Sequence, residues 1–455
     1  MAFSPQQLIS QLPEGQFACL LGFSGGLDSH VLLHSLCQLR DSADTRINLK
    51  AIHVHHGLSA CADLWAEHCR AVCAAYNVPL QVCKVSVENS GQGLENAARN
   101  ARLGVFQENL SADEYLLTAH HLDDQMETML FRMMRGTGLR GLSGIFLERP
   151  LGGGKLLRPL LGVDRTALKQ YAEQQGLEWI EDESNAHEDF DRNYLRQKVM
   201  PLLSSRWPGY RKNWQRLAQL AGEGQTLQRE LGMQDLVKVQ NGIHRLDIAC
   251  LLEFSPLRQR NIVRQWFLFL EENHGIPAPD YYVVERLFDE LIPAAEDGTP
   301  MLTWEKAGLR VEVRRYASRI YLVLPEQIST GADKISWDTS GPLVLPGHLG
   351  NLSLIESSED GIALIPGETL EVGFKQGGET VKPAGRKTRP MKKVLPDYGV
   401  PPWLREKTPF IYRQGELLAV ADLFVCDQHQ LDINPENDKK MFKLQWLRSD
   451  LHCGY

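Results

Sequence analysis

Residues 24–29 read Ser-Gly-Gly-Leu-Asp-Ser and stand between an apolar run and a segment whose leucines recur at helical spacing. The two glycines let the backbone pass close to a ligand, and the first turn of the following helix offers free N–H groups to an anion. The hydroxyls of Ser24 and Ser29 and the carboxylate of Asp28 add donors and a cation ligand. We therefore predict an anion cradle suited to pyrophosphate. The structural alternative is a strand-to-helix turn capped by Ser24 or Asp28.

Asp124 and Glu127 form a second group that suits chemistry. They are three residues apart in a predicted helix, so they share one face. Two carboxylates on one face repel each other unless a cation lies between them, and an amine substrate or Mg²⁺ would supply it. The structural alternative is an acidic first turn that complements the helix dipole.

Histidines and cysteines are the usual ligands of a metal or cluster, and both are present. The histidines concerned are His53, His55, His56, His120 and His121. Alternation along a strand places His56 on the face opposite to His53 and His55, and cysteine-rich zinc spacing is missing. We expect some of these histidines to line a nucleotide pocket. The nine cysteines of the chain do not indicate a disulfide scaffold, and no C-x-x-C pair occurs among Cys61, Cys69, Cys73 and Cys83.

Alternating strands and helices must position these groups. Strands are predicted at 17–23, 47–56, 79–87 and 114–120, and helices follow them, at about 27–39, 62–76, 94–110 and 123–135. Repeated β-α-β units predict a doubly wound, mostly parallel sheet with helices on both faces. Ligands bind beyond the carboxyl ends of such strands, which is where the candidate residues fall.

The remaining chain suggests two further parts. The pattern is helical from 217 to about 291 and β-rich up to about 324, and 326–339 has the polar, Gly/Ser-containing composition of a linker. The last 115 or so residues predict a small mixed α+β domain. With 455 residues, we predict a catalytic domain at 1–216, a mainly helical domain at 217–330 and a C-terminal domain at 340–455.

The motifs together resemble a known family. The hexapeptide at 24–29 looks like the PP-loop of the N-type ATP pyrophosphatases. Residues 117–128 (LTAHHLDDQMET) and 135–142 (RGTGLRGL) resemble the signature of the bacterial tRNA(Ile)-lysidine synthetases. His55-His56-Gly57-Leu58, Glu95-Asn96-Ala97-Ala98-Arg99, Asp182-Glu183-Ser184-Asn185 and residues 192–196 also fit it.

The resemblance implies a Rossmann-like domain and a ligase that forms a carbon–nitrogen bond. Such an enzyme converts the wobble cytidine of a CAU-anticodon isoleucine tRNA to lysidine through an adenylated cytidine, with ATP, Mg²⁺ and free lysine. The tRNA then carries isoleucine instead of methionine. The expected ATP-binding residues are Ser24, Gly25, Gly26, Leu27, Asp28, Ser29 and His55. The expected lysine-binding residues are Asp124 and Glu127, and the expected catalytic ones are Asp28, also the metal ligand, with Asp124, Glu127, Arg192 and Arg196.

Charge is unevenly spread along the chain. The net charge is −8, yet residues 192–216 and 375–413 each carry +7, which leaves −22 on the rest. Basic runs interleaved with aromatic residues suit an RNA backbone and splayed bases. A solvated basic face is the alternative for either run alone. We predict RNA-binding roles for Arg206, Arg211, Lys212, Arg386, Lys387, Arg389, Lys392 and Lys393.

Three other functions stay open: a PP-loop tRNA thiolase, an amide synthetase for free metabolites, and an RNA-binding protein with an inactive nucleotide fold. The missing C-x-x-C pair disfavours thiolation, the two basic segments disfavour a metabolite synthetase, and the intact hexapeptide disfavours the third. The start of the chain does not read as a signal peptide, and no stretch is long and apolar enough to cross a bilayer. We therefore expect a cytoplasmic protein without a membrane partner, and a homodimer is left open.

Overall fold

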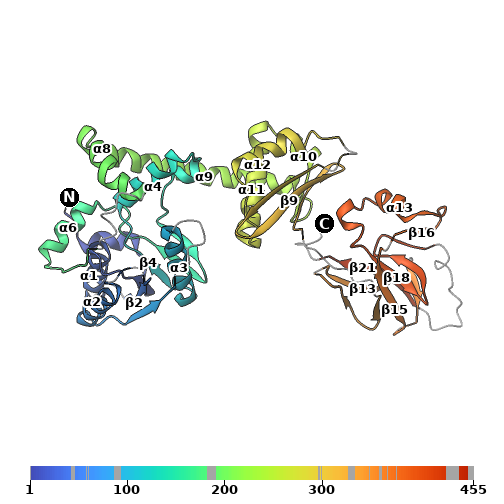
Figure 1. The fold of residues 1–455 in the computed structure, drawn as a ribbon, viewed down its shortest axis with the longest axis horizontal. Coiled ribbons are helices and arrows are strands. Elements are labelled where there is room, and N and C mark those ends of the chain that lie inside the picture. The colour runs from blue at the N-terminus through green and yellow to red at the C-terminus, as the bar shows by residue number, and fades with distance from the viewer. Residues whose placement is uncertain are drawn as a thin grey trace. The chain divides into compact units, whose positions relative to one another are not determined.

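The computed structural model describes most of the chain in two compact units, Met1–Leu227 and Gln228–Tyr455 (Figure 1). The described residues are 2–42, 47–57, 59, 61–86, 94–181, 191–295, 298, 300–325, 334–347, 349–357, 361–365, 367–375, 377–426 and 440–448. The side chains of residues 94–96 are outside this description, as are Leu58 and the predicted motif at 182–185.

A six-stranded sheet with the order β3-β2-β1-β4-β6-β5 forms the centre of the first unit. Its strands are β1 (Phe17–Gly22), β2 (Ile47–His55), β3 (Leu80–Lys84), β4 (Tyr115–Leu117), β5 (Glu148–Leu151) and β6 (Gly154–Leu157). All neighbours pair in parallel except β5 and β6, which form an antiparallel hairpin. The predicted, mostly parallel sheet is confirmed.

Helices cover both faces of this sheet because residues along β1 alternate between two cores. Cys19 and Leu21 face the larger core with α1 (Leu27–Asp41), α2 (Ala62–Ala75) and α6 (Arg165–Gln174). Leu20 faces a smaller core with Val105 and Phe106 of α3 (Leu94–Asn109). Figure 1 shows α1 and α2 on one side of the sheet and α3 on the other.

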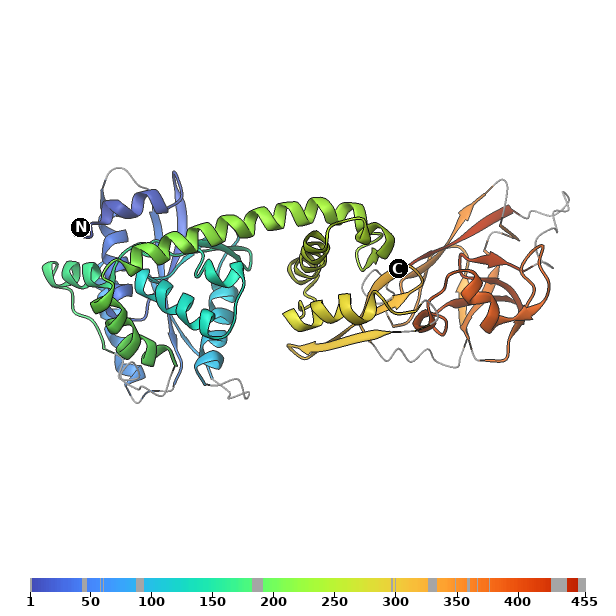
Figure 2. The same cartoon turned by 90° about the horizontal axis from the view of Figure 1, so that it is seen from above.

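Several shorter helices complete the first unit. They are η1 (Pro5–Gln11), α4 (Leu122–Met134), α5 (Leu139–Leu142), α7 (Asp191–Tyr194), the π-helical turn η3 (Leu195–Val199) and α8 (Met200–Arg206). Met126 and Met129 of α4 pack with Met200 and Tyr210 in a separate small core. The long helix α9 (Tyr210–Val239) then runs from the first unit into the second as one unbroken helix (Figure 2). The predicted domain limit at residue 216 lies inside α9.

The first part of the second unit combines helices with a four-stranded sheet of order β7-β10-β9-β8. The elements are β7 (Arg245–Asp247), α10 (Ile248–Leu252), α11 (Pro256–His274), α12 (Tyr281–Arg286), the π-helical turn η4 (Leu287–Leu291), β8 (Met301–Lys306), β9 (Leu309–Tyr316) and β10 (Arg319–Val323). Trp266 and Phe267 of α11 lie at the centre of its core. The predicted succession of helices and then strands is confirmed.

The C-terminal part is mostly β, so the predicted mixed α+β composition was wrong in its balance. Three antiparallel sheets contain β11 (Ile335–Asp338), β12 (Leu343–Val344), β13 (Asn351–Glu356), β14 (Ile362–Leu364), β15 (Thr369–Phe374), β16 (Thr380–Val381), β17 (Arg389–Pro390), β18 (Pro409–Arg413), β19 (Glu416–Val420), β20 (Phe424–Val425) and β21 (Lys440–Leu447). Among the described residues here, helix is limited to α13 (Met391–Asp397) and η5 (Pro402–Leu404). Strands of two to four residues show too little alternation to be recognised in the sequence.

Two further predictions can be compared with the described residues. Residues 326–339 were predicted as a linker, but strand β11 (Ile335–Asp338) lies within this segment and pairs with β15 in a sheet. Across the described ranges, no helix has the length and apolar character that crossing a bilayer requires.

Candidate active site

The hexapeptide turn follows β1 and begins α1, as predicted. The hydroxyls of Ser24 and Ser29 lie 3.0 Å apart, and Ser29 Oγ donates to the carbonyl of Gly26 at 2.9 Å. Gly26 is the N-cap of α1, and within the described part of the chain no side chain caps this helix. The first turn of α1 is therefore open to an anion, as a phosphate cradle requires. Ser24 Oγ accepts the backbone N–H of Gly26 at 3.4 Å, which is a bond to the N-cap residue itself and leaves the N–H groups of the first turn of α1 uncapped among the described residues.

Gly25 has the backbone conformation that makes this turn possible. Its φ is +81°, in the left-handed region that favours glycine. A Cβ atom there would lie 3.0 Å from Cys69 Sγ and 3.1 Å from Ile180 Cδ1. The carbonyl of Gly25 accepts the N–H of Ile180 at 3.0 Å. The turn is thus fixed from both sides, by α2 and by the segment after α6.

Asp28 lies in the first turn of α1 and faces an imidazole and a guanidinium. Its Oδ2 is 3.6 Å from His121 Nε2, and its Oδ1 is 3.8 Å from Arg165 Nε. Oδ1 is also buried and has no hydrogen-bond partner among the residues that the structure describes. A buried carboxylate oxygen without a donor is an available ligand for a hard cation.

His121 connects this turn to the helix that carries the predicted carboxylates. His121 is the N-cap of α4, and its ring Nδ1 accepts the backbone N–H of Asp124. In return, Asp124 Oδ2 accepts the backbone N–H of His121 at 2.9 Å. Its Nε2 also lies 3.4 Å from Asp124 Oδ2. Burial disfavours its charge, yet the carboxylates of Asp28, Asp124 and Asp123 raise the pKa of His121. The imidazole therefore lies between the two acidic groups of the site.

Asp124 and Glu127 share one face of α4, as the i,i+3 spacing predicted, and the cation beside them is Arg196. Arg196 Nε donates to Glu127 Oε1 at 2.7 Å, and Nη2 donates to Glu127 Oε2 at 2.8 Å. The same Nη2 is 3.4 Å from Asp124 Oδ1. Arg196 comes from η3, 69 residues further along the chain.

The protonation of Glu127 and Arg196 reflects burial and mutual attraction. Burial raises the pKa of Glu127 above its usual value, although Arg196 opposes the change. Burial disfavours the charge of Arg196, but Glu127 and Asp124 together raise its pKa. A carboxylate with a raised pKa suits a general base that works near neutral pH.

The other histidines lie around the same edge of the sheet. His55 ends β2, with Nε2 3.3 Å from Asp63 Oδ1. His53 Nδ1 is 2.9 Å from the carbonyl of Phe23, and burial lowers the pKa of His53. His120 Nδ1 is 2.9 Å from Thr118 Oγ1. Burial, reinforced by Arg158, Arg102 and Arg99, lowers the pKa of His120 to about 4, so its ring is neutral at physiological pH.

Within the described ranges, no three His, Cys, Asp or Glu side chains are grouped so that they could hold a metal ion. Mg²⁺ needs fewer protein ligands, because it binds through one or two carboxylates together with substrate phosphates. Asp28 is the residue of this site suited to bind Mg²⁺, because its Oδ1 has no donor among the described residues.

The predicted RNA-binding and catalytic arginines of residues 192–216 have different environments. Arg192 on α7 lies 6.0 Å from the ring of Phe131, and Arg206 lies 6.0 Å from the ring of Trp207. Arg211 is engaged inside the protein, with Nη2 2.8 Å from Asp123 Oδ1. Lys212, its neighbour on α9, is exposed.

All five predicted RNA-binding residues of the C-terminal part are exposed, on β17, α13 and the segment before them. They are Arg386, Lys387, Arg389, Lys392 and Lys393. Arg386 lies 5.1 Å from the ring of Tyr398, and Arg389 pairs with Asp397 at 2.5 Å.

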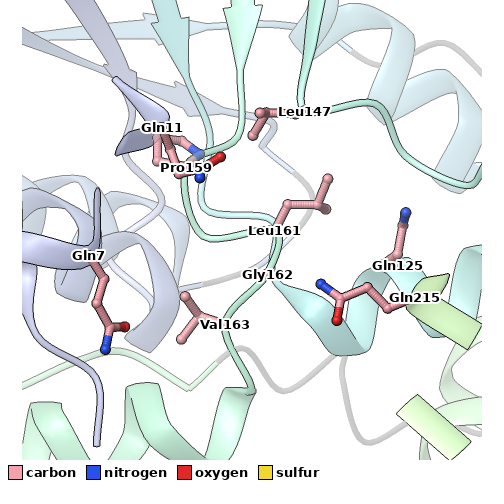
Figure 3. A pocket seen from close by; sticks show the side chains of 9 residues that line it. All are labelled: Gln7, Gln11, Gln125, Leu147, Pro159, Leu161, Gly162, Val163 and Gln215. Carbon is pink, nitrogen blue, oxygen red and sulfur yellow. The ribbon is translucent and has the colours of Figure 1, made fainter. Parts of the chain in front are cut away.

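A cavity of about 370 Å³ lies beside α4 (Figure 3). Figure 3 shows Gln125 and Gln215 on facing helices, with Leu161, Gly162 and Val163 between them and the N-terminal segment. An adjoining groove of about 590 Å³ shares Gln125 and Gln215 and includes Lys212 and Arg216 of α9. Neither cavity is lined by residues 24–29 or by the Asp124–Glu127 pair.

Sequence reasoning missed the structural roles of His121, Arg165 and Arg211. The pattern His121-x-x-Asp124 at the start of a helix was the available signal, because it has the spacing of a capping box. Arg165 and Arg211 gave no comparable signal, since they reach the site from distant segments.

Three segments of the chain match models of known protein families. Residues 3–203 match the PP-loop domain, residues 246–321 match the TilS substrate binding domain, and residues 370–446 match the TilS substrate C-terminal domain.

Full-length relatives match nearly the whole chain. A tRNA(Ile)-lysidine synthase of Coxiella burnetii is 36% identical over 433 residues, which cover 93% of each chain. That of Pseudomonas aeruginosa is 42% identical over 414 residues, which cover 89% of each chain. A solved structure, the U34-tRNA thiolase NcsA from Methanococcus maripaludis with its [4Fe-4S] cluster, is 17% identical with a TM-score of 0.40, and covers 48% of this chain and 78% of that one.

Proposed function

The chain belongs to the tRNA(Ile)-lysidine synthase family, and from that premise we propose that it joins lysine to the wobble cytidine of the isoleucine tRNA with a CAU anticodon. ATP activates the cytidine, and pyrophosphate and AMP are released. The modified tRNA changes its amino-acid specificity from methionine to isoleucine. The enzyme is a ligase that forms a carbon–nitrogen bond and acts in the cytoplasm.

The observation that supports this proposal best is the convergence of the phosphate turn and the carboxylate pair. His121 lies within 3.6 Å of Asp28 and within 3.4 Å of Asp124. An anion site and a cation site are therefore adjacent at the carboxyl edge of the sheet. A reaction that joins an ATP-activated base to an amine needs this adjacency.

In the first step, the turn at residues 24–29 binds the phosphates of ATP. The uncapped N-terminus of α1 and the hydroxyls of Ser24 and Ser29 supply donors to them. Cytosine O2 attacks the α-phosphorus, and pyrophosphate leaves. Asp28 would hold Mg²⁺, which supplies charge neutralisation to the phosphates when bound.

In the second step, the ε-amine of lysine attacks C2 of the activated cytosine. AMP leaves with the bond electrons, and the amine must lose a proton. Asp124 and Glu127 would bind and orient the amine, and Glu127 would accept the proton, in keeping with its raised pKa. Arg192 and Arg196 would pair with the phosphate of the adenylate or of the RNA.

We keep the three-part division of the chain as part of this proposal: catalysis at 1–216, tRNA binding at 217–330 and at 340–455. The exposed basic residues of the C-terminal part would contact tRNA away from the anticodon, and Lys212 would contribute near the groove along α9.

The direct test is incubation of the protein with ATP, labelled lysine and bulk tRNA. We expect label in tRNA, and its absence would contradict the proposal. Asp28→Ala and Glu127→Ala should each abolish the transfer. Full lysine incorporation by either variant would exclude the role assigned to that residue.

A further inference from the structure

The proposed function requires Asp124 and Glu127 to be free to bind the amine of lysine. In the structure, the guanidinium of Arg196 already binds both carboxylates. The contact is extensive, because the guanidinium takes both oxygens of Glu127 and reaches Oδ1 of Asp124. The fourth oxygen, Asp124 Oδ2, accepts the backbone N–H of His121 at 2.9 Å. Each of the four carboxylate oxygens is thus already engaged by a donor of the chain itself.

A lysine ammonium therefore has a competitor inside the protein. An ammonium donates three hydrogen bonds and would need two or three of these same oxygens. If Arg196 remained, two cations would crowd one pair of carboxylates, and like charges at that distance disfavour each other.

Burial shows which of the partners is able to move. The side chain of Glu127 is 5% exposed and that of Asp124 is 23% exposed, whereas that of Arg196 is 34% exposed. Asp124 is also tied to the N-cap residue of its own helix. Arg196 is carried by a π-helical turn, a rare element that recurs at functional sites. The arginine is therefore the member of the group that would leave.

Phosphate is the partner that would attract it. Guanidinium binds phosphate with two parallel hydrogen bonds, as it binds a carboxylate. Asp28, at the phosphate turn, also acts electrostatically on Arg196, and His121 contacts both Asp28 and Asp124. A nucleotide phosphate on the turn would thus lie on the side of the site toward which Arg196 can be drawn.

We propose that Arg196 is a positioning residue that withholds Asp124 and Glu127 from lysine until a nucleotide phosphate draws its guanidinium away. This inference rests on the proposed function. It orders the reaction, because the amine binds only once the activating nucleotide is in place. No covalent step is added, since Arg196 only exchanges one anionic partner for another.

The test measures lysine affinity by equilibrium dialysis at pH 8, with and without α,β-methylene-ATP, which binds but does not release pyrophosphate. In the wild type, we expect the nucleotide to raise lysine affinity at least about fivefold, a typical coupling between two sites. A third arm adds tRNA together with α,β-methylene-ATP, so that no lysine is ligated during the measurement, and shows whether an RNA phosphate adds to the effect of the ATP phosphates.

Arg196→Gln is the decisive variant. Without the competing guanidinium, lysine should bind several-fold tighter in the absence of nucleotide, and the nucleotide should then add little. A merely structural arginine would instead lower lysine affinity in both states. Lys169→Gln, which removes one positive charge at an exposed position of α6 where Nζ lies 3.9 Å from Glu173 Oε1, should behave as the wild type.

Two results would overturn the inference. One is a wild type whose lysine affinity does not respond to α,β-methylene-ATP, with or without tRNA, a measurement that needs no variant to fold. The other is a folded Arg196→Gln protein that binds lysine no tighter than the wild type. Either result leaves the proposed function intact if label still reaches tRNA, whereas failure of that transfer in the wild type would remove the proposed function itself.

Discussion

Arg211, in the first turn of α9, donates two hydrogen bonds of 2.8 and 3.1 Å to Oδ1 of Asp123. The other oxygen of Asp123, Oδ2, accepts the backbone N–H of Arg165 at 3.1 Å. Asp123 thus joins the start of α4 to α9 and to α6. Since Asp124 is the next residue, this contact helps to set the position of the carboxylate pair.

Replacing Arg211 with alanine should therefore affect catalysis and not only RNA affinity. It leaves a mostly buried Asp123 without its cation, and we expect a loss of about 2 kcal/mol in stability and about tenfold slower lysine transfer. The adjacent Lys212→Ala is the matched control. It should leave the melting temperature unchanged and weaken tRNA binding alone. Equal effects of the two variants would contradict the positioning role of Arg211.

Gly25→Ala should disable nucleotide binding. The new Cβ atom meets Cys69 and Ile180 at about 3 Å and also strains the backbone at φ +81°, so the turn must shift. We expect at least a tenfold increase in the KM for ATP and a loss of about 1–2 kcal/mol in stability. Gly176→Ala has a φ of +63° and open space around it. This control measures backbone strain by itself and should leave the KM unchanged.

Acid should destabilise the first unit. Burial lowers the pKa of His53 and of His30 below the usual value of 6.5. Below that value the unfolded chain binds protons that the folded chain excludes, so stability falls as the pH falls. Melting temperatures recorded from pH 7.5 to 5.5 should decrease, and less steeply for His53→Asn, because its amide cannot take up a proton. An identical pH slope in that variant would show that His53 does not contribute.

The cysteines should be dispensable for chemistry. Burial raises the pKa of Cys69 and of Cys73 to about 12, which keeps both thiols protonated. Cys61 and Cys83 are the more accessible ones in the first unit. The Cys61→Ser, Cys83→Ser double variant should transfer lysine at the wild-type rate. A complete loss with normal folding would favour the thiolase alternative.

The exposed lysines of α13 should act on tRNA through charge. Removing both, as Lys392→Gln with Lys393→Gln, should reduce the slope of log Kd for tRNA against log salt concentration by roughly 1 to 2. Lysine and ATP binding should not change. Lys440→Gln, which removes a lysine paired with Glu356 at 3.0 Å, is the control. An unaltered salt slope in the double variant would place the RNA surface elsewhere.

The sequence was sufficient where function depends on local spacing. The strand–turn–helix around residues 24–29 was predicted because hydrophobic periodicity changes at the glycines, and Asp124 and Glu127 were placed on one face by helical geometry. Both features were confirmed.

What could not be predicted depends on long-range packing. The contact of Arg196 with Glu127 spans 69 residues, and no local pattern indicates which of several arginines would meet the carboxylates. The same holds for Arg211 and Asp123, 88 residues apart. In the C-terminal part, two-residue strands such as β16 form because a neighbouring strand pairs with them. A stretch of two residues is too short to show the side-chain alternation that predicts a strand.

The position of β1 has a kinetic consequence. It pairs with β2 over six residues and with β4 over three, and Cys19 and Leu21 are fully buried within it. Opening this strand would disrupt both pairings and the core on each face. Its amide protons should therefore exchange with deuterium among the slowest in the first unit. The turn at residues 24–29 directly follows this strand. It should therefore keep its conformation during local opening of the ends of the surrounding helices.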